Sequence, residues 1–299
     1  PLTAEDCRSA IRAKGVAVAS NLAGFDIGLE AVEEDVKPRQ EDSDDIFNKA
    51  PTEFYAEISM FPDTTHDIIS HGIARLIDYQ SPDYAREYLK RLRIISDMDK
   101  DKTKKLTSEI ARHLARWMSF EDVIRVAQLK TRPERLSRIR RELQVGSDIP
   151  LKLTDYFKPG RDEVLGVVPR GLSWLIPTLK KGVALHIPTG SAFGFAMLKF
   201  LSILKPLRSK TKQYDGEQKA IDQWLNAVIE ANARDYYLAC QTASLAILAR
   251  GYGDVRKTGL EKLDSLFVNW KNKLKNNYPK TVAEVDQIIL IAQSNPDAI

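Results

Sequence analysis

Residues 69–95 read ISHGIARLIDYQSPDYAREYLKRLRII and predict two helices joined by a turn. In the first half, Ile69, Ile73 and Leu76 recur at intervals of three and four residues, which places their side chains on one face of a helix. The residue before a proline avoids the helical backbone conformation, so the first helix is expected to end before Pro82. Pro82 itself suits the first turn of the next helix. The stretch therefore predicts an αα-hairpin, in which two helices pack side by side.

The same helical spacing of apolar residues recurs along most of the chain. Two short segments bounded by proline or glycine, residues 151–154 and 183–187, have instead the composition of extended strands and could pair as a ribbon. We therefore expect a mainly α fold, a multi-helix orthogonal bundle with room for one short two-stranded β ribbon. Besides the hairpin, helices are predicted over residues 3–14, 16–32, 106–117, 119–132, 135–143, 221–248, 260–270 and 282–291.

Two of these helices begin with a side chain that can accept a hydrogen bond from the unpaired backbone N–H groups of the first turn. Thr3 followed by Asp6 predicts the start of the first helix, because the hydroxyl can cap it and the acid meets the positive end of the helix dipole. Ser119 is expected to cap the helix that follows it.

A charged stretch near the N-terminus suggests a division of the chain. Residues 33–45 contain many charged residues, one proline and almost no apolar residues, which is typical of a linker. We expect residues 1–35 to be the last helices of a preceding domain, residues 36–50 to be a linker and residues 51–299 to be a helical C-terminal domain. Because the chain starts at Pro1 and opens directly into a capped helix, we expect it to be a piece of a longer polypeptide.

The composition is that of a soluble globular protein. Hydrophobic residues make up 43% of the chain and charged residues 29%, and no apolar run is long enough to cross a bilayer. The two cysteines, Cys7 and Cys240, lie far apart in the sequence, which favours free thiols in a reducing compartment, and we expect the cytoplasm. The net charge of +4 is small for 299 residues, so we expect neither a nucleic-acid partner nor a membrane surface.

No Gly-x-Ser-x-Gly elbow and no paired Cys-x-x-Cys is present to specify a catalytic centre. Glu109 and His113 are four residues apart, close enough on a helix to clamp a metal, but one such pair supplies fewer ligands than a closed zinc site needs. We interpret the pair as a local hydrogen bond. We expect no catalytic residue, no metal ligand set and no cofactor in this chain.

The densest charged feature is a basic stretch in residues 125–141. Arginine side chains can grip phosphate or RNA through paired hydrogen bonds. Against that function, Glu134 and Glu142 dilute the charge and the stretch has no aromatic residue on which a base could stack. The alternatives are a solvated face or a docking face towards another, acidic domain. The basic residues of the stretch are Arg125, Lys130, Arg132, Arg135, Arg138, Arg140 and Arg141.

The segment GYGD at residues 251–254 has two interpretations. Backbone N–H groups exposed by glycine can cradle an anion. A phosphate loop, however, follows a strand and carries more glycines, whereas this segment follows a predicted helix. We favour a turn at a helix C-terminus in which Gly251 or Gly253 has a positive φ. The candidate binding residues of the chain are Arg125, Lys130, Arg132, Arg135, Gly251, Tyr252 and Gly253.

Several stretches taken together carry a family resemblance. They are DYQ at 78–80 with YA at 84–85 and YL at 88–89, then ARHLARWM at 111–118 running into EDVIRVA at 121–127 and LKTR at 129–132, and then GYGD at 251–254. In this order and approximate spacing they resemble the C-terminal helical region of indolepyruvate:ferredoxin oxidoreductase beta-subunit-like proteins. The opening, with AIR at 10–12 and NLAGF at 21–25, is similar to the last helices of the gamma-type 2-oxoacid oxidoreductase domain. The likeness spans nearly the whole chain.

The resemblance implies that the chain serves a complex that oxidatively decarboxylates aryl pyruvates and passes the electrons to ferredoxin. It implies a non-catalytic structural and interaction domain, inactive alone, whose partners are the other domains and subunits of the oxidoreductase and which meets ferredoxin only indirectly. Thiamine diphosphate and iron–sulfur clusters are expected elsewhere in the complex. The alternative is a ligand-handling domain whose arginines bind an acidic substrate or the phosphates of coenzyme A.

Overall fold

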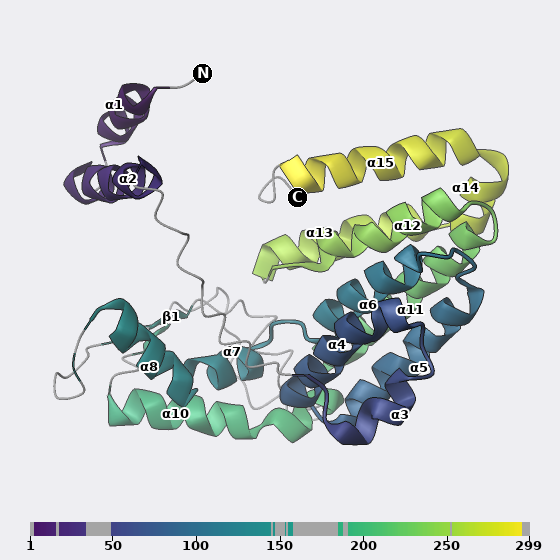
Figure 1. Ribbon diagram of the computed structural model, residues 1–299, viewed down its shortest axis with the longest axis horizontal. Coiled ribbons are helices and arrows are strands. Elements are labelled where there is room, and N and C mark those ends of the chain that lie inside the picture. The colour runs from purple at the N-terminus through teal and green to yellow at the C-terminus, as the bar shows by residue number, and fades with distance from the viewer. Residues whose placement is uncertain are drawn as a thin grey trace. The chain divides into compact units, whose positions relative to one another are not determined.

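The computed structural model describes residues 3–15, 18–33, 49–144, 146, 153, 155–157, 185–187, 191–251 and 253–294 (Figure 1). These residues form a multi-helix, mainly α structure, which confirms the predicted fold class. The chain divides into two compact units, Pro1–Asn48 and Lys49–Ile299. Most of the predicted linker lies outside the described residues, so the limits 1–35 and 51–299 remain predictions. Among the described helices, none combines the length and the apolar content that crossing a bilayer requires.

The first unit contains α1 (Ala4–Lys14) and α2 (Val18–Glu33). Thr3 caps α1 as predicted, because its Oγ1 accepts a hydrogen bond from the Asp6 backbone N–H at 3.2 Å while the Asp6 carboxylate accepts from the Thr3 N–H at 2.8 Å. The Arg8 Nε then joins the two helices by donating to the Asp26 carboxylate at 2.8 Å. None of the described side chains of the two helices is buried. The described side chains of the pair therefore form no core of their own.

The first part of the second unit holds the predicted hairpin. Ser81 accepts a hydrogen bond from the Tyr84 N–H and Pro82 occupies the first turn of the second helix, so the proline both ends one helix and starts the next. The Tyr88 hydroxyl donates to the Ala111 carbonyl at 3.1 Å and so ties the hairpin to the following helix. The elements are η1 (Thr52–Phe54), α3 (Tyr55–Ile58), η2 (Asp63–Thr65), α4 (His66–Tyr79), α5 (Pro82–Met98) and α6 (Lys105–Met118).

An aspartate outside the helix satisfies the N-terminus of α6. Lys104, the residue that precedes the helix, has a positive φ of 53° and makes no side-chain cap. Instead the buried Asp99 carboxylate accepts from the Thr107 N–H at 2.9 Å and from its hydroxyl at 2.7 Å. Asp99 belongs to an alternating run with Asp97 and Asp101, a spacing of carboxylates that calcium loops also use. Here that spacing serves a helix start, and the described residues contain no group of three or more metal-ligating side chains.

The middle of the second unit differs from expectation at a cap and at a helix. Asp122, not Ser119, caps α7 by accepting from the Arg125 N–H at 2.5 Å, so the predicted cap is wrong. Ser119 ends α6 instead, where its hydroxyl donates to the Ala115 carbonyl at 2.8 Å. The helix α10 was not predicted, and it packs against α7. The elements are α7 (Val123–Lys130), α8 (Pro133–Glu142), β1 (Asp155–Phe157), β2 (Leu185–Ile187), α10 (Ala192–Ile203) and η4 (Lys205–Lys210).

The ribbon predicted from the sequence is present. The strands β1 and β2 pair antiparallel, with Tyr156 opposite His186. The second strand lies within the predicted segment 183–187. The first begins at Asp155, one residue beyond the predicted segment 151–154, of which only Leu153 is described.

The last part of the second unit packs α11 against α12, and both against α6 (Figure 1). Trp117 of α6 and Trp224 of α11 lie in one core, with ring centroids 5.4 Å apart. The helix predicted over residues 260–270 is divided, because Asn269 takes a positive φ of 55° between α13 and α14. The elements are α11 (Lys212–Asn232), α12 (Tyr236–Ser244), η5 (Leu245–Ala249), α13 (Gly253–Phe267), α14 (Trp270–Asn276) and α15 (Tyr278–Ser294).

Candidate anion-binding site

Buried carboxylates of the second unit hold most of its buried arginines. The Arg208 guanidinium makes a paired contact with Asp122, with Nε 2.6 Å from Oδ2 and Nη2 3.2 Å from Oδ1. The Arg256 guanidinium grips Glu217 in the same way, at 2.6 and 2.7 Å. The Trp117 indole N–H donates to that same Glu217 carboxylate at 2.9 Å. Each pair joins separate elements of the fold, so these charges hold helices together.

Two of the predicted binding arginines belong to a third such cluster. Arg125 Nη1 lies 2.6 Å from Asp78 Oδ2, and Arg132 Nη2 lies 2.5 Å from the same atom. The contact joins α7 and the start of α8 to the C-terminal end of α4. Arg125 is buried, with 4% of its surface exposed. The structure therefore places the first arginine of the basic stretch inside the protein and gives both arginines a carboxylate partner.

The other predicted residues lie in different places. Arg135 is half-buried and donates to the Lys130 carbonyl at 3.2 Å, which keeps these two residues together at the junction of α7 and α8. Gly251 and Gly253 both have positive φ, 78° and 60°, which confirms the interpretation of this segment as a turn. Tyr252 lies outside the described residues. Among the described residues, Arg125 and Arg132 thus contact Asp78, while Gly251 lines a hollow to which none of the predicted basic residues contributes.

The ionisation of Asp78 makes the stability of the fold depend on pH. Burial raises the pKa of the Asp78 carboxyl, but the charges and hydrogen bonds of Arg125 and Arg132 together lower it by more. The pKa of Asp78 therefore lies below its usual value. A carboxylate with a lowered folded-state pKa contributes stability above its unfolded-state pKa, and this contribution is lost as the pH falls through the folded-state pKa.

The substitution Asp78→Asn is expected to lower the free energy of unfolding at neutral pH by about 1–3 kcal/mol, because it weakens hydrogen bonds that involve charged groups. The difference from the unchanged protein should shrink in acid, where the native carboxyl also becomes neutral. Urea unfolding at neutral pH and at about pH 3 measures both values. The matched control is Asp83→Asn, since the Asp83 side chain is 93% exposed in its ion pair with Arg86, and little change is expected there. A difference that stays constant across the pH range would contradict the assignment.

Gly251 contributes to a hollow of about 260 Å³ that is rich in arginine. The hollow lies between α4, α6, the turn after η5 and the start of α13. Its walls include the buried residues Trp117 and Phe120. The ionisable groups that line it are Arg75, His113, Arg116, Glu121, Arg250 and Arg256.

The positive charges of this hollow are only partly balanced. Arg256 is neutralised by Glu217, whereas no ion pair joins the Arg116 or Arg250 guanidinium to a carboxylate among the described residues. Burial lowers the pKa of Arg75, the nearby positive charges of Arg125 and Arg116 lower it further, and the negative charges of Glu121 and Asp78 offset part of this effect. Burial and then the charge of Arg116 likewise lower the pKa of Arg250. Arg116 is therefore close enough to repel both of the other arginines, an arrangement that an anion would relieve.

Neighbouring groups orient two ionisable side chains of the hollow. Arg75 Nε donates to the Ser119 hydroxyl, which in turn donates to the Ala115 carbonyl. His113 Nε2 lies 3.5 Å from the Glu109 carboxylate, which confirms the expected local contact between this pair. The hydrogen bond of His113 is also the largest cause of the lowered pKa of Glu109.

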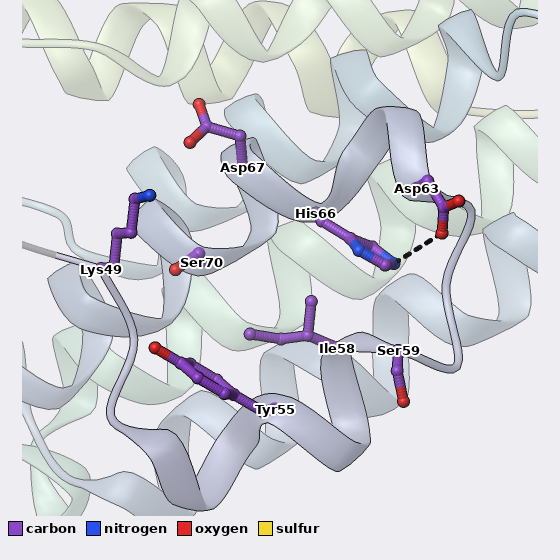
Figure 2. A pocket seen from close by; sticks show the side chains of 8 residues that line it. All are labelled: Lys49, Tyr55, Ile58, Ser59, Asp63, His66, Asp67 and Ser70. Atoms are coloured by element: carbon purple, nitrogen blue, oxygen red, sulfur yellow. Dashed lines mark ion pairs between the residues drawn. The ribbon is translucent and has the colours of Figure 1, made fainter.

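A second hollow, of about 490 Å³, lies beside α3, η2 and α4 (Figure 2). Figure 2 shows His66 and Asp63 facing each other, with Nε2 3.7 Å from Oδ1. His66 Nε2 is also 2.7 Å from the Phe61 carbonyl, and because a carbonyl can only accept, this nitrogen carries the proton. Ser70 accepts from the Ala50 N–H at 2.7 Å. This hollow has charged groups of both signs, and its His66 and Ser70 side chains already make hydrogen bonds within the protein. It is therefore a weaker candidate for ligand binding than the arginine hollow.

Sequence reasoning missed Arg75, Arg116 and Arg250. Two signals could have pointed to them. Arg116 lies in the stretch 111–118 that carries the family resemblance, and Arg250 directly precedes the glycine turn. Arg75 has no local signal, because only packing brings α4 beside α6.

The fold and the arginine hollow define a mainly helical protein whose second unit is held together by internal guanidinium–carboxylate contacts. Residues 65–267 match the model of a family of unknown function, DUF6537, and the chain belongs to that family. No curated protein and no solved structure matches the chain. The matched range contains every residue that lines the arginine hollow, whereas α1 and α2 lie outside it.

Proposed function

We propose that the chain is a non-catalytic structural and interaction domain of an indolepyruvate (2-oxoacid):ferredoxin oxidoreductase subunit. In this role it supports the oxidative decarboxylation of aryl pyruvates by the full complex in the cytoplasm. The proposal is supported by the resemblance of residues 78–132 and 251–254, and by the use of Asp78, Asp122 and Glu217 in contacts between helices.

The observation that carries the interaction role is the exposure of α1 and α2. These helices have 11 and 16 residues, and helices in proteins draw most of their stability from the packing of one face against other elements. No described side chain of the pair is buried, and Ile27 is 67% exposed. A pair of helices that buries nothing gains stability by docking on another surface. We assign that surface to the gamma-type domain of the same oxidoreductase.

The chain itself does not suit an iron–sulfur cluster. Such clusters are held by several thiolates converging on one point. The sequence has Cys7 in the first unit and Cys240 in the second, and no other cysteine. Burial raises the pKa of the Cys240 thiol, which opposes formation of the thiolate that binds metal. Iron–sulfur clusters therefore belong to other parts of the proposed complex, to which the resemblance also assigns thiamine diphosphate.

The test isolates the complex through an affinity tag on this chain. We expect the other subunits of the oxidoreductase to co-purify with the chain. The purified complex should reduce methyl viologen with indolepyruvate in the presence of coenzyme A, whereas the chain purified alone should not. The substitution Ile27→Asp is expected to lower the recovered activity at least about tenfold, because a charge on the docking face must be desolvated. Ile94→Asp is the matched control, since Ile94 is 55% exposed on α5 in the second unit, and full recovery is expected.

Turnover by the chain alone would contradict the non-catalytic assignment. Co-purifying proteins without 2-oxoacid activity would contradict the assignment to this oxidoreductase. Equal losses in the Ile27 and Ile94 variants would contradict the docking role of α2.

The alternative, a ligand-handling domain, is favoured by the arginine hollow around Gly251 and not by the arginines that the sequence suggested for it. The arginines that the sequence suggested for it, Arg125 and Arg132, are bound to Asp78. In the arginine hollow around Gly251, the Arg116 and Arg250 guanidinium groups pair with no carboxylate of the described residues.

A further inference from the structure

We infer that the hollow between α4, α6 and the Gly251 turn binds a small oxoanion with two negative charges, of the phosphate-monoester class. This inference goes beyond the proposed function, because it concerns the isolated chain and holds whichever complex the chain serves. It rests on the charges that line the hollow, on its walls and on its size.

The charge of the hollow matches a dianion. Arg116 and Arg250 each bring one positive charge, and the positive charge of Arg75 is offset by the negative charge of the nearby Glu121. Arg256 adds no net charge, because Glu217 neutralises it. The excess is therefore two positive charges, which a phosphate monoester would balance and a single carboxylate would balance only by half.

The walls of the hollow strengthen such a contact. Trp117 and Phe120 line the hollow and are each only 3% exposed, so on their side protein rather than water lies behind the charged groups. Coulomb attraction and charge-assisted hydrogen bonds grow as the local dielectric falls. Guanidinium groups also offer planar pairs of N–H donors that fit phosphate oxygens.

The size of the hollow limits the ligand. A volume of about 260 Å³ is below the usual range for pockets that enclose whole drug-sized ligands. It suits a phosphate group with the remainder of the molecule outside. The source of the group is thus either a free phosphate or the phosphate end of a larger molecule such as a nucleotide.

Titration calorimetry of the full chain with inorganic phosphate tests the inference. We expect saturable binding that weakens as salt is added, because the attraction is electrostatic. The double substitution Arg116→Gln with Arg250→Gln is expected to weaken it at least about tenfold, since both charge-assisted contacts are lost. Both side chains are exposed, so the fold should tolerate the change. Arg138→Gln, an exposed arginine on α8, is the matched control and should bind phosphate as the unchanged chain does.

The substitution Glu121→Gln distinguishes an electrostatic effect on phosphate binding from a structural defect of the hollow. Because it removes the negative charge that faces the hollow, it is expected to tighten phosphate binding by about threefold to tenfold. A structural defect would weaken binding instead, so weaker binding to this variant contradicts the inference.

Further arms identify the source of the anion and its charge. Competition of coenzyme A with phosphate would show that the phosphate of a nucleotide occupies the hollow, and absence of competition would assign the hollow to free phosphate. Indolepyruvate, a monocarboxylate, is expected to bind at least about tenfold more weakly than phosphate. Equal affinity for indolepyruvate, no phosphate binding at about 10 mM, or equal losses in the Arg138 control would overturn the inference.

Discussion

Replacing Arg208 with methionine is expected to lower the free energy of unfolding of the second unit by about 3–5 kcal/mol. The Arg208 side chain is fully buried, and all of its donors contact acceptors: Asp122, the Tyr79 carbonyl, Gln80 and Gln128. Its guanidinium also stacks 4.0 Å from the centroid of the Tyr79 ring. Methionine keeps much of the length but leaves the Asp122 carboxylate buried without a partner charge. Urea unfolding of the full chain measures the loss.

A second substitution distinguishes the lost charge from lost packing. In the double variant Arg208→Met with Asp122→Asn no uncompensated charge remains, while asparagine can still cap α7 as Asp122 does. We expect this variant to recover at least about 1 kcal/mol relative to Arg208→Met alone. Arg138→Met, which removes an arginine from an exposed pair with Glu142, should change stability little. No recovery in the double variant would show that the buried charge is not the cause of the loss.

Gly259→Ala is expected to destabilise the second unit by about 3 kcal/mol or more, at the upper end of the range for overpacked sites. A Cβ at Gly259 of α13 would overlap the Leu248 carbonyl of η5, and its two nearest neighbours are backbone atoms that cannot rotate away. The helix and the preceding 3₁₀ turn must therefore separate, which also disturbs the turn at Gly251. Urea unfolding, with the near-ultraviolet signal of the tryptophans as a probe of side-chain packing, follows the change.

Gly216→Ala provides the matched control for this substitution. Gly216 lies within α11 and a Cβ there would meet nothing within 4 Å. Alanine is a better helix former than glycine, so this variant should be more stable by about 0.5–1 kcal/mol. A Gly259→Ala protein as stable as the unchanged chain would contradict the close approach of α13 to η5.

Helix ends that depend on neighbouring residues were predictable. Thr3 with Asp6, the Ser81-Pro82 pair and the Gly251 turn act through hydrogen bonds or φ preferences within a few residues, and the structure confirms each. The cap at Ser119 was wrong because a hydroxyl can serve either helix end. The Ser119 hydroxyl donates to the Ala115 carbonyl in the last turn of α6, while Asp122 precedes α7 and caps it.

The helix α10 was missed for a different reason. Its sequence, AFGFAMLKFLSI, is apolar on nearly every side, so it lacks the two-faced pattern that distinguishes a helix from another apolar segment. In the structure α10 packs against α7, a contact that its sequence pattern alone does not predict.

Local chemistry along the chain was enough to specify a mainly helical protein, the helix starts at Thr3 and Pro82 and the positive φ of Gly251, because those features depend on residues close in sequence. The partners of the charged side chains were decided by packing. Arg125 and Arg132 were expected to face ligand, solvent or another domain, yet they meet Asp78, which lies 47 and 54 residues earlier. Arg75, Arg116 and Arg250 come from separate elements and form one hollow only when α4, α6 and η5 pack together. Electrostatic energy depends on distance in space, and the order of residues along the chain does not contain that distance until the helices assemble.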